Sequence, residues 1–100
     1  MRGYNLSSAT VQELQGGMKK EPDDEKITRQ FMPIIIRRYR DKAGLSQQQA
    51  ADAAGISKGY LNGMERGKDM VNVDMLVKLA RVYSVRPGEM LDAMVDESEK

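Results

Sequence analysis

Apolar residues recur at three- and four-residue steps between residues 28 and 43, and this spacing predicts an amphipathic helix from about Thr28 to Ala43. One face carries the apolar side chains, which are Phe31, Met32, Ile35, Ile36 and Tyr39. Pro33 conflicts with a continuous helix, because proline fits a first turn but breaks an interior. We therefore expect the helix to begin near Met32, with residues 28–32 as a separate turn, and to stop at Gly44.

A short helix follows at once. Ser46 is a strong N-cap, and Gln49 stands three residues later, which completes a capping box. Four alanines at positions 50, 51, 53 and 54 favour the helix and keep it slim. Gly55 is expected to take positive φ and to end this helix.

A second short helix begins after its cap Ser57 and runs to about Arg66, with Leu61 and Met64 pointing inward. Two further amphipathic helices complete the pattern. The first is capped by Asn72, and its apolar side comprises Val73, Leu76, Val77, Leu79, Ala80 and Tyr83. Pro87 occupies the first turn of the second, whose apolar residues are Met90, Leu91, Met94 and Val95. No segment alternates at period two for long enough to be a strand, so the expected fold class is all-α with five helices.

The two ends of the chain differ from its middle in composition. We expect residues 1–26, which are rich in Gly and charge, to form a mobile arm with at most a short helix from Thr10 to Gln15. Residues 27–95 form the helical domain, and residues 96–100 form a frayed acidic tail. Met18 is an alternative translation start, a hypothesis that N-terminal sequencing of the native protein tests.

Missing residue types narrow the function. The sequence has no Cys and no His, which removes disulfides, thiolate metal sites and the commonest general base. It also lacks an evident carboxylate pair and a Gly-rich phosphate loop, so we expect no enzyme, no metal and no cofactor. Because there is no apolar run of about 18 residues and no secretion signal, the expected location is cytoplasmic, with no membrane partner.

The charge distribution is more informative than the net charge of +1. Residues 27–91 carry eleven Lys/Arg against six Asp/Glu, whereas acids outnumber bases in residues 1–26 and 92–100. A basic body between acidic ends suits a surface that binds phosphates, although an ordinary soluble surface also has such a charge.

Residues 46–67 form a pair of short helices joined by a tight turn that contains Gly55, which is the pattern of a helix-turn-helix. In such a unit the second helix stands clear of the body to enter the major groove of DNA, and the first lies across it. Ala50 and Ala51 provide the small side chains that the helix crossing requires. Ile56 and Leu61 anchor the pair on the core.

The sequence resembles the Cro/C1-type (XRE) family of phage-repressor-like helix-turn-helix regulators over about residues 31–94. The resemblance rests on Arg40, on GLSQ at 44–47, AADAAGIS at 50–57, YLNGMERGK at 60–68, VDMLVKLARVYSV at 73–85 and the PGEML that follows. It implies a five-helix, lambda-repressor-like fold. It also implies a dimeric, sequence-specific regulator of transcription, most often a repressor, that binds double-stranded DNA.

The resemblance places Ser57, Lys58 and Gly59 on the turn that reaches the base edges. Lys58 can donate to O6 and N7 of guanine, and equally to a phosphate. Asn62, one turn further on, can pair with N6 and N7 of adenine.

The resemblance also assigns supporting contacts. Gln47 contacts a phosphate and braces a side chain of the reading helix, and Arg66 and Lys68 contact the DNA backbone. For each of these polar residues the alternative is an ordinary solvated side chain. The resemblance further implies that Arg40 and Glu65 form an ion pair, which sets the pose of the reading helix and does not itself read DNA.

Gly59 and Gly63 depart from the family pattern, because relatives often have base-reading side chains there. They lie four residues apart and hence on one face of the helix. Their presence indicates a close approach of the backbone to DNA and a greater reliance on DNA shape, and the rival interpretation is a surface that no longer reads DNA well.

The last helix is the expected dimer interface. Its apolar stripe, which includes Met90, Leu91 and Met94, has little chain left to cover it, and relatives often form dimers here. A two-fold dimer would then set half-sites about one helical turn apart.

Two other functions remain open on the sequence alone. An antitoxin would use the same domain together with a protein partner bound through the N-terminal arm, and a co-purifying toxin would identify it. A protein-interaction module without DNA specificity would account for the two glycines, and it would show no preferred DNA sequence. The sequence does not give the operator, the target genes or an inducing signal.

Overall fold

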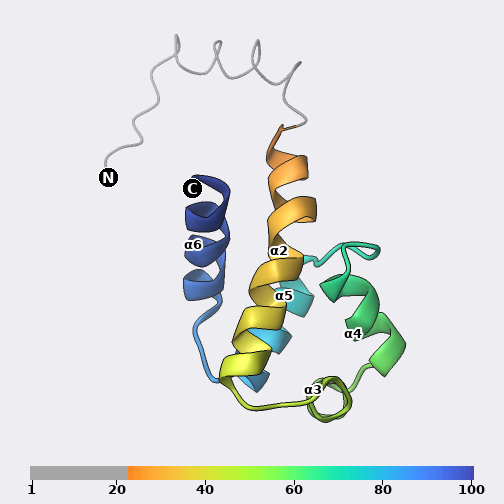
Figure 1. The fold of residues 1–100 in the computed structure, drawn as a ribbon. Helices are drawn as coiled ribbons and strands as arrows, with labels where there is room; N and C mark the ends of the chain where they lie inside the picture. Colours follow the sequence, from red (N-terminus) through yellow and green to blue (C-terminus); the bar gives the residue numbers. More distant parts are fainter. Residues whose placement is uncertain (1–22) are drawn as a thin grey trace, which may run out of the picture.

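The computed structural model describes the backbone of residues 23–100 and the side chains of residues 27–100. This part of the chain contains five α-helices and no strand, so the expected all-α class is confirmed (Figure 1). They are α2 (Asp23–Lys42), α3 (Gln47–Ala54), α4 (Lys58–Glu65), α5 (Val73–Val82) and α6 (Pro87–Ser98).

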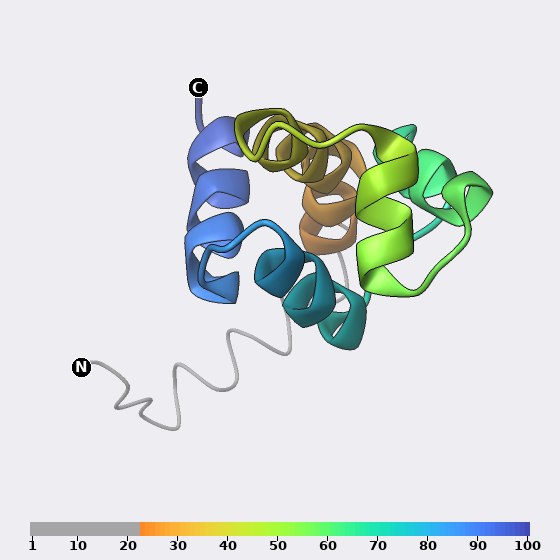
Figure 2. The ribbon, with the colours of Figure 1, turned by 90° about the horizontal axis from the view of Figure 1, so that it is seen from below.

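The long helix α2 is the centre of the arrangement. It packs against α6, which runs back along it in the opposite direction, and against α4 on another side. The helix α5 packs against α3 and α6. Seen along α2, the pair α3 and α4 lies on one side and α6 on the other (Figure 2). The helix-turn-helix pair is therefore attached to one flank of a three-helix body.

Apolar side chains from all five helices form one core. Six large side chains are fully buried, namely Ile35, Ile36, Leu61, Met64, Leu79 and Met90. The contribution of α3 consists of Ala50, Ala51 and Ala54. Because alanine has only a methyl group, α3 can lie close to its neighbours and still bury its inner face. Leu61 and Met64 point inward as expected.

The expected start near Met32 is wrong, because α2 begins at Asp23 and contains Pro33 in its interior. A proline inside a helix costs about 3 kcal/mol through its missing N–H and a steric clash. Here Pro33 is buried beside Gly67 of the α4–α5 loop, and Ile27 and Phe31 pack against the core. Burial of these apolar groups offsets that cost. The expected arm also ends earlier, since residues 23–26 are helical.

The expected caps are present. The Ser46 hydroxyl accepts from the backbone N–H of Gln49 at 3.0 Å, and the Gln49 amide oxygen accepts from the N–H of Ser46 at 2.9 Å. Ser57 caps α4 and Asn72 caps α5 in the same way, through N–H donors three residues later. Gly55 has a φ of 71°, as its position at the end of α3 requires.

The expected frayed tail at 96–100 is wrong for its first residues, because α6 continues to Ser98. An ion pair explains the extension. Arg38 of α2 donates to the carboxylate of Glu97 at 2.6 Å and ties the last turn of α6 to the central helix. The Ser98 hydroxyl also donates to the carbonyl of Val95 at 2.7 Å.

The predicted arm, the short helix from Thr10 to Gln15 and the alternative start at Met18 lie outside the described residues. Among residues 23–100, no helix has both the length and the hydropathy that crossing a membrane demands.

Candidate nucleic-acid interface

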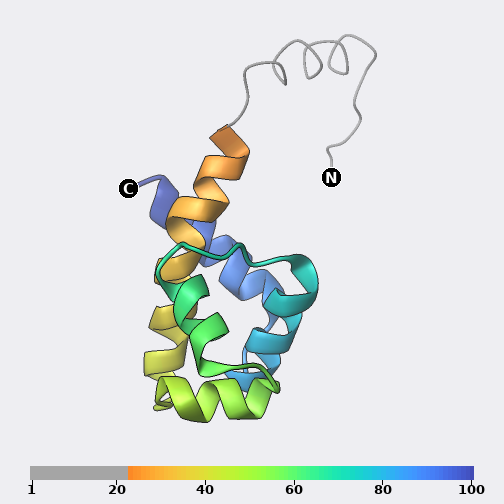
Figure 3. The ribbon, with the colours of Figure 1, turned by 90° about the vertical axis from the view of Figure 1, so that its right-hand side faces the viewer.

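The helices α3 and α4 and the turn between them form the candidate site. Ala50 and Ala51 are fully buried where α3 meets its neighbours, and α3 packs directly on α4. The N–H of Ile56 donates to the carbonyl of Ala51 at 3.0 Å, which closes the turn, and the Ile56 side chain packs against the core. Figure 3 shows α3 and α4 together at the outside of the molecule. The geometry is that of a helix-turn-helix, as the sequence predicts.

The two faces of α4 differ sharply. Leu61, Gly63 and Met64 are buried, whereas Ser57, Lys58 and Gly59 at the beginning of the helix are exposed. Asn62 is half-buried on the side toward α3. The exposed first turn thus presents a hydroxyl, an ammonium group and a bare backbone to a ligand.

Arg40 and Glu65 meet as the sequence predicts. The guanidinium Nε donates to Oε2 of Glu65 at 2.6 Å, and Nη2 donates to Oε1 at 3.0 Å. The side chains are 11% and 4% exposed, so the pair is largely shielded from water. Arg40 also donates to the carbonyl of Leu45 at 2.9 Å. One buried, two-pronged contact therefore links α2, the loop before α3 and the end of α4.

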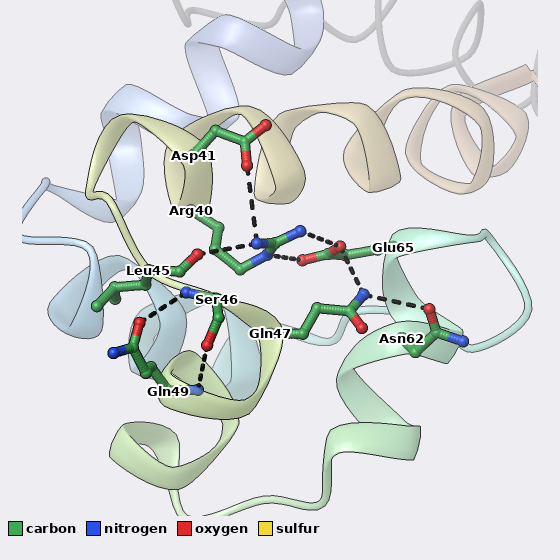
Figure 4. Close-up of polar contacts among 8 residues, drawn as sticks. All are labelled: Arg40, Asp41, Leu45, Ser46, Gln47, Gln49, Asn62 and Glu65. Carbon is green, nitrogen blue, oxygen red and sulfur yellow. Dashed lines mark hydrogen bonds and ion pairs between the residues drawn. The ribbon is translucent and has the colours of Figure 1, made fainter.

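Gln47, at the start of α3, extends this contact. Its amide nitrogen Nε2 donates to Oε1 of Glu65 at 2.9 Å and to Oδ1 of Asn62 at 3.1 Å (Figure 4). The brace from Gln47 to a side chain of α4 is thus formed, and its partner is Asn62. The sequence does not predict the second bond, from Gln47 to Glu65. No spacing rule indicates it, because it depends on how α3 and α4 cross.

Electrostatics favour the charged pair. The hydrogen bond to Glu65 raises the pKa of Arg40 above its already high value, so the guanidinium stays charged. Nearby, burial in the core raises the pKa of Tyr83 to about 12, and the negative charge of Glu65 adds to the rise. The Tyr83 hydroxyl is buried and has no hydrogen-bond partner among the described residues. The tyrosine is therefore neutral and leaves the ion pair undisturbed.

The basic residues at the edge of the site are available to a ligand. Lys58, Arg66 and Lys68 are all exposed. In residues 27–100, no carboxylate lies within ion-pair distance of any of the three. Such free cations near one helix are what phosphate contacts require.

Gly63 does not lie on the exposed face, which corrects the expectation for the two glycines. The α4–α5 loop folds over it, and its carbonyl accepts from the N–H groups of Lys68 and Asp69 at 2.8 and 3.1 Å. A Cβ at this position would collide with the Asp69 carboxylate, whereas a Cβ at Gly59 would meet open space. Of these two glycines, only Gly59 has an exposed backbone.

Only part of the apolar stripe expected at the dimer interface is exposed. Met90 and Met94 are 0% and 7% exposed, because they belong to the core of this chain and face α2 and α5. They are therefore not available to a second copy. Leu91 and Val95, one turn apart, are each 43% exposed and form the free apolar stripe of α6.

Comparisons with known proteins agree with this geometry. Residues 36–90 match the model of a helix-turn-helix family. The chain is 39% identical over 67 residues to the HTH-type transcriptional regulator SlrR of Bacillus subtilis, a match that covers 66% of this chain and 44% of SlrR. It is 29% identical over 58 residues to the control protein C.BamHI of Bacillus amyloliquefaciens, covering 57% of this chain and 72% of that protein.

A solved structure gives the same fold. The clp gene regulator ClgR from C. glutamicum superposes with a TM-score of 0.67 at 23% identity, over 70% of this chain and 91% of that chain. The chain thus spans less than half of SlrR, but most of C.BamHI and nearly all of the solved ClgR chain.

Proposed function

The chain belongs to the helix-turn-helix family, and from this premise we propose that it is a regulator of transcription that reads double-stranded DNA with α4 in the major groove. We further propose that it binds its operator as a dimer and represses transcription. The names of its relatives support regulation, since SlrR is a transcriptional regulator and C.BamHI a control protein.

One observation carries the proposal: the end of α4 is held by largely buried hydrogen bonds, while its beginning is exposed. Glu65, the last residue of α4, is bonded to Arg40 of α2 and to Gln47 of α3. The first turn of α4, which contains Lys58 and Gly59, is exposed to solvent. A helix that is fixed at one end and bare at the other suits insertion into a groove, because its pose is set before DNA binds.

The proposed roles follow from position. Ser57, Lys58 and Gly59 approach the base edges, and Asn62 lies one turn further on. Arg66 and Lys68 follow the end of α4 and suit contacts with phosphates. Leu91 and Val95 form the proposed contact between two copies. A two-fold dimer would place the two α4 helices in half-sites about 34–36 Å apart or a multiple of that distance.

The test is selection of bound fragments from random DNA, followed by affinity measurements at several salt concentrations. We expect a palindromic motif and an affinity that falls as salt rises. Lys58→Ala and Asn62→Ala should each weaken binding to the motif. Lys78→Ala, which removes an exposed positive charge from α5 outside the proposed face, is the matched control. Salt-dependent binding without a motif would overturn sequence-specific reading.

A further inference from the structure

Donor and acceptor chemistry fixes the direction of each hydrogen bond in one cluster of the site. The cluster consists of Arg40, Glu65, Gln47 and Asn62. An ionised carboxylate only accepts hydrogen bonds. The carboxylate of Glu65 accepts from Arg40 at both oxygens and also faces the side-chain amide of Gln47. Gln47 must therefore turn its NH2 group, and not its oxygen, toward Glu65. The buried ion pair thus fixes the orientation of the neighbouring amide.

The same logic passes from Gln47 to Asn62. The NH2 group of Gln47 has two hydrogens, and the second is directed to Asn62 at 3.1 Å. Asn62 must meet this donor with its oxygen, since its own NH2 group would set two donors against each other. The Asn62 oxygen consequently faces Gln47, and its nitrogen points away from the cluster (Figure 4).

We propose that this relay, the chain of hydrogen bonds from Glu65 through Gln47 to Asn62, fixes Asn62 as a hydrogen-bond donor toward DNA, which favours the acceptor edge of guanine over adenine. The inference rests on the proposed function, since it assumes that α4 reads a groove. A bidentate contact with adenine needs the amide oxygen and nitrogen of Asn62 to face the same base. That oxygen already accepts from Gln47, which fixes its direction and leaves it one lone pair for a base. Guanine presents two acceptors, N7 and O6, to which the two free hydrogens of the Asn62 nitrogen can donate.

The relay also changes the role expected of the Gln47 side chain. Both hydrogens of its NH2 group are directed inside the protein, to Glu65 and Asn62. Its remaining polar atom is the amide oxygen, which cannot bind a phosphate because both groups are acceptors. The phosphate contact expected of the Gln47 side chain is therefore replaced by a positioning role for Asn62.

The relay can be tested without DNA by measuring hydrogen exchange of the side-chain NH2 groups by NMR. We expect the NH2 group of Gln47 to exchange about tenfold more slowly than that of Gln49, because a bond to a charged group is worth about 1.5–3 kcal/mol. Gln49 is a matched reference, since only its oxygen is bonded. Asn62 should exchange as fast as Gln49. Greater protection of Asn62 than of Gln47 would reverse the polarity and overturn the relay.

The use of the relay is tested by DNA selection with two variants. Asn62→Asp can still accept from Gln47 but presents an oxygen outward, so guanine at one motif position should give way to a base with an amine, such as cytosine. Gln47→Met frees the Asn62 amide, so adenine and guanine should both be accepted there. The wild type should prefer guanine over adenine at this position by about tenfold. Melting curves establish that both variants are folded.

Three results would overturn the proposal. One is adenine at the affected position of the wild-type motif. Another is a motif that Asn62→Asp leaves unchanged. The third is a loss of affinity in Asn62→Asp that is equal for all DNA sequences, which would mean that Asn62 donates to a phosphate and not to a base. Asn72→Asp, which adds the same charge at the cap of α5, should leave the motif unchanged. If the wild type selects no motif, the proposed function and this use of Asn62 both fail, and the exchange rates show whether the relay itself exists.

Discussion

Glu65 is the residue that connects most of the site. Its carboxylate is 4% exposed and accepts hydrogen bonds from Arg40 and Gln47. A buried ion pair adds little net stability compared with apolar packing, yet the loss of one partner leaves an uncompensated charge in the interior. The effect of a substitution here therefore exceeds the value of the bonds that it removes.

Glu65→Ala should lower the melting temperature and weaken DNA binding together. Removing one member of a buried pair costs about 3–5 kcal/mol, because Arg40 remains charged and buried. Thermal unfolding and operator binding measure the two effects. Glu99→Ala, which removes an exposed acid from the end of the chain, is the control. Unchanged melting of Glu65→Ala would count against a stabilising role of the pair.

Gly59→Ala should raise stability and lower the affinity for DNA. Alanine favours a helix over glycine by about 0.8–1 kcal/mol, and a Cβ at this position meets open space. The same methyl group would hold the backbone of the exposed turn away from a base edge. Urea unfolding and DNA titration separate the two quantities.

Gly63→Ala is the matched comparison for that experiment. Its Cβ would displace the Asp69 carboxylate, so the gain in helix propensity should be reduced or lost. If Gly59→Ala bound DNA as tightly as the wild type, the close approach of this turn to DNA would be excluded.

At the scale of helices, the sequence predicts what local chemistry determines. The caps Ser46, Ser57 and Asn72 act within four residues, so the starts of α3, α4 and α5 could be predicted. The ends that depend on distant partners could not. Pro33 is tolerated because a loop more than thirty residues later covers it, and the end of α6 is extended by Arg38. The spacing of residues along the sequence predicts neither of these two contacts.

The pair Arg38–Glu97 makes the attachment of α6 dependent on pH. The hydrogen bond from Arg38, and then that from Lys100, lowers the pKa of Glu97 below its usual range. Because the folded-state pKa is lowered, this stabilisation is present above the unfolded value of about 4.3 and is lost as the pH falls through the folded-state pKa.

Glu97→Gln should therefore be less stable than the wild type at neutral pH and equal to it in strong acid. Urea unfolding of both proteins at about pH 7 and about pH 2.5 measures the difference, since the lower value lies below the ordinary pKa of Glu. Glu99→Gln, whose carboxylate forms no ion pair within the described residues, should show a smaller change with pH. A difference that stays constant across this range would remove Glu97 as the cause.

For the whole molecule, the sequence identifies the kind of surface but not its detailed chemistry. The helix-turn-helix and the resemblance to Cro/C1-type regulators are confirmed by the family match over residues 36–90. The orientation of the Asn62 amide was not predictable, because it is imposed by Glu65 through a residue on a different helix. Likewise, periodicity places Met90 and Leu91 on one helix but does not say which of them the body covers.

Leu91→Glu tests whether two copies associate through α6. We expect sedimentation to show a shift toward monomers and weaker binding to a palindromic operator, since a charge replaces an exposed apolar contact. Its melting temperature as a monomer should change little, because substitutions at exposed sites stay within about 0.5 kcal/mol. Val73→Glu, at the most exposed large apolar side chain among residues 27–100, is the control. A wild type that is monomeric with and without operator DNA would refute the proposed interface.

Pro33 also has a consequence for how the molecule opens. Pro33 has no backbone N–H and cannot donate to the carbonyl of Arg29. The series of backbone hydrogen bonds along α2 is therefore interrupted there. Fraying that begins at Asp23 meets this break before it reaches Arg40. In native-state hydrogen exchange, α2 should therefore behave as two cooperative units, with the half that follows Pro33 opening only when the whole domain unfolds. Local opening of the first turns of α2 would then leave Arg40 bonded to Glu65, and α4 would keep its orientation.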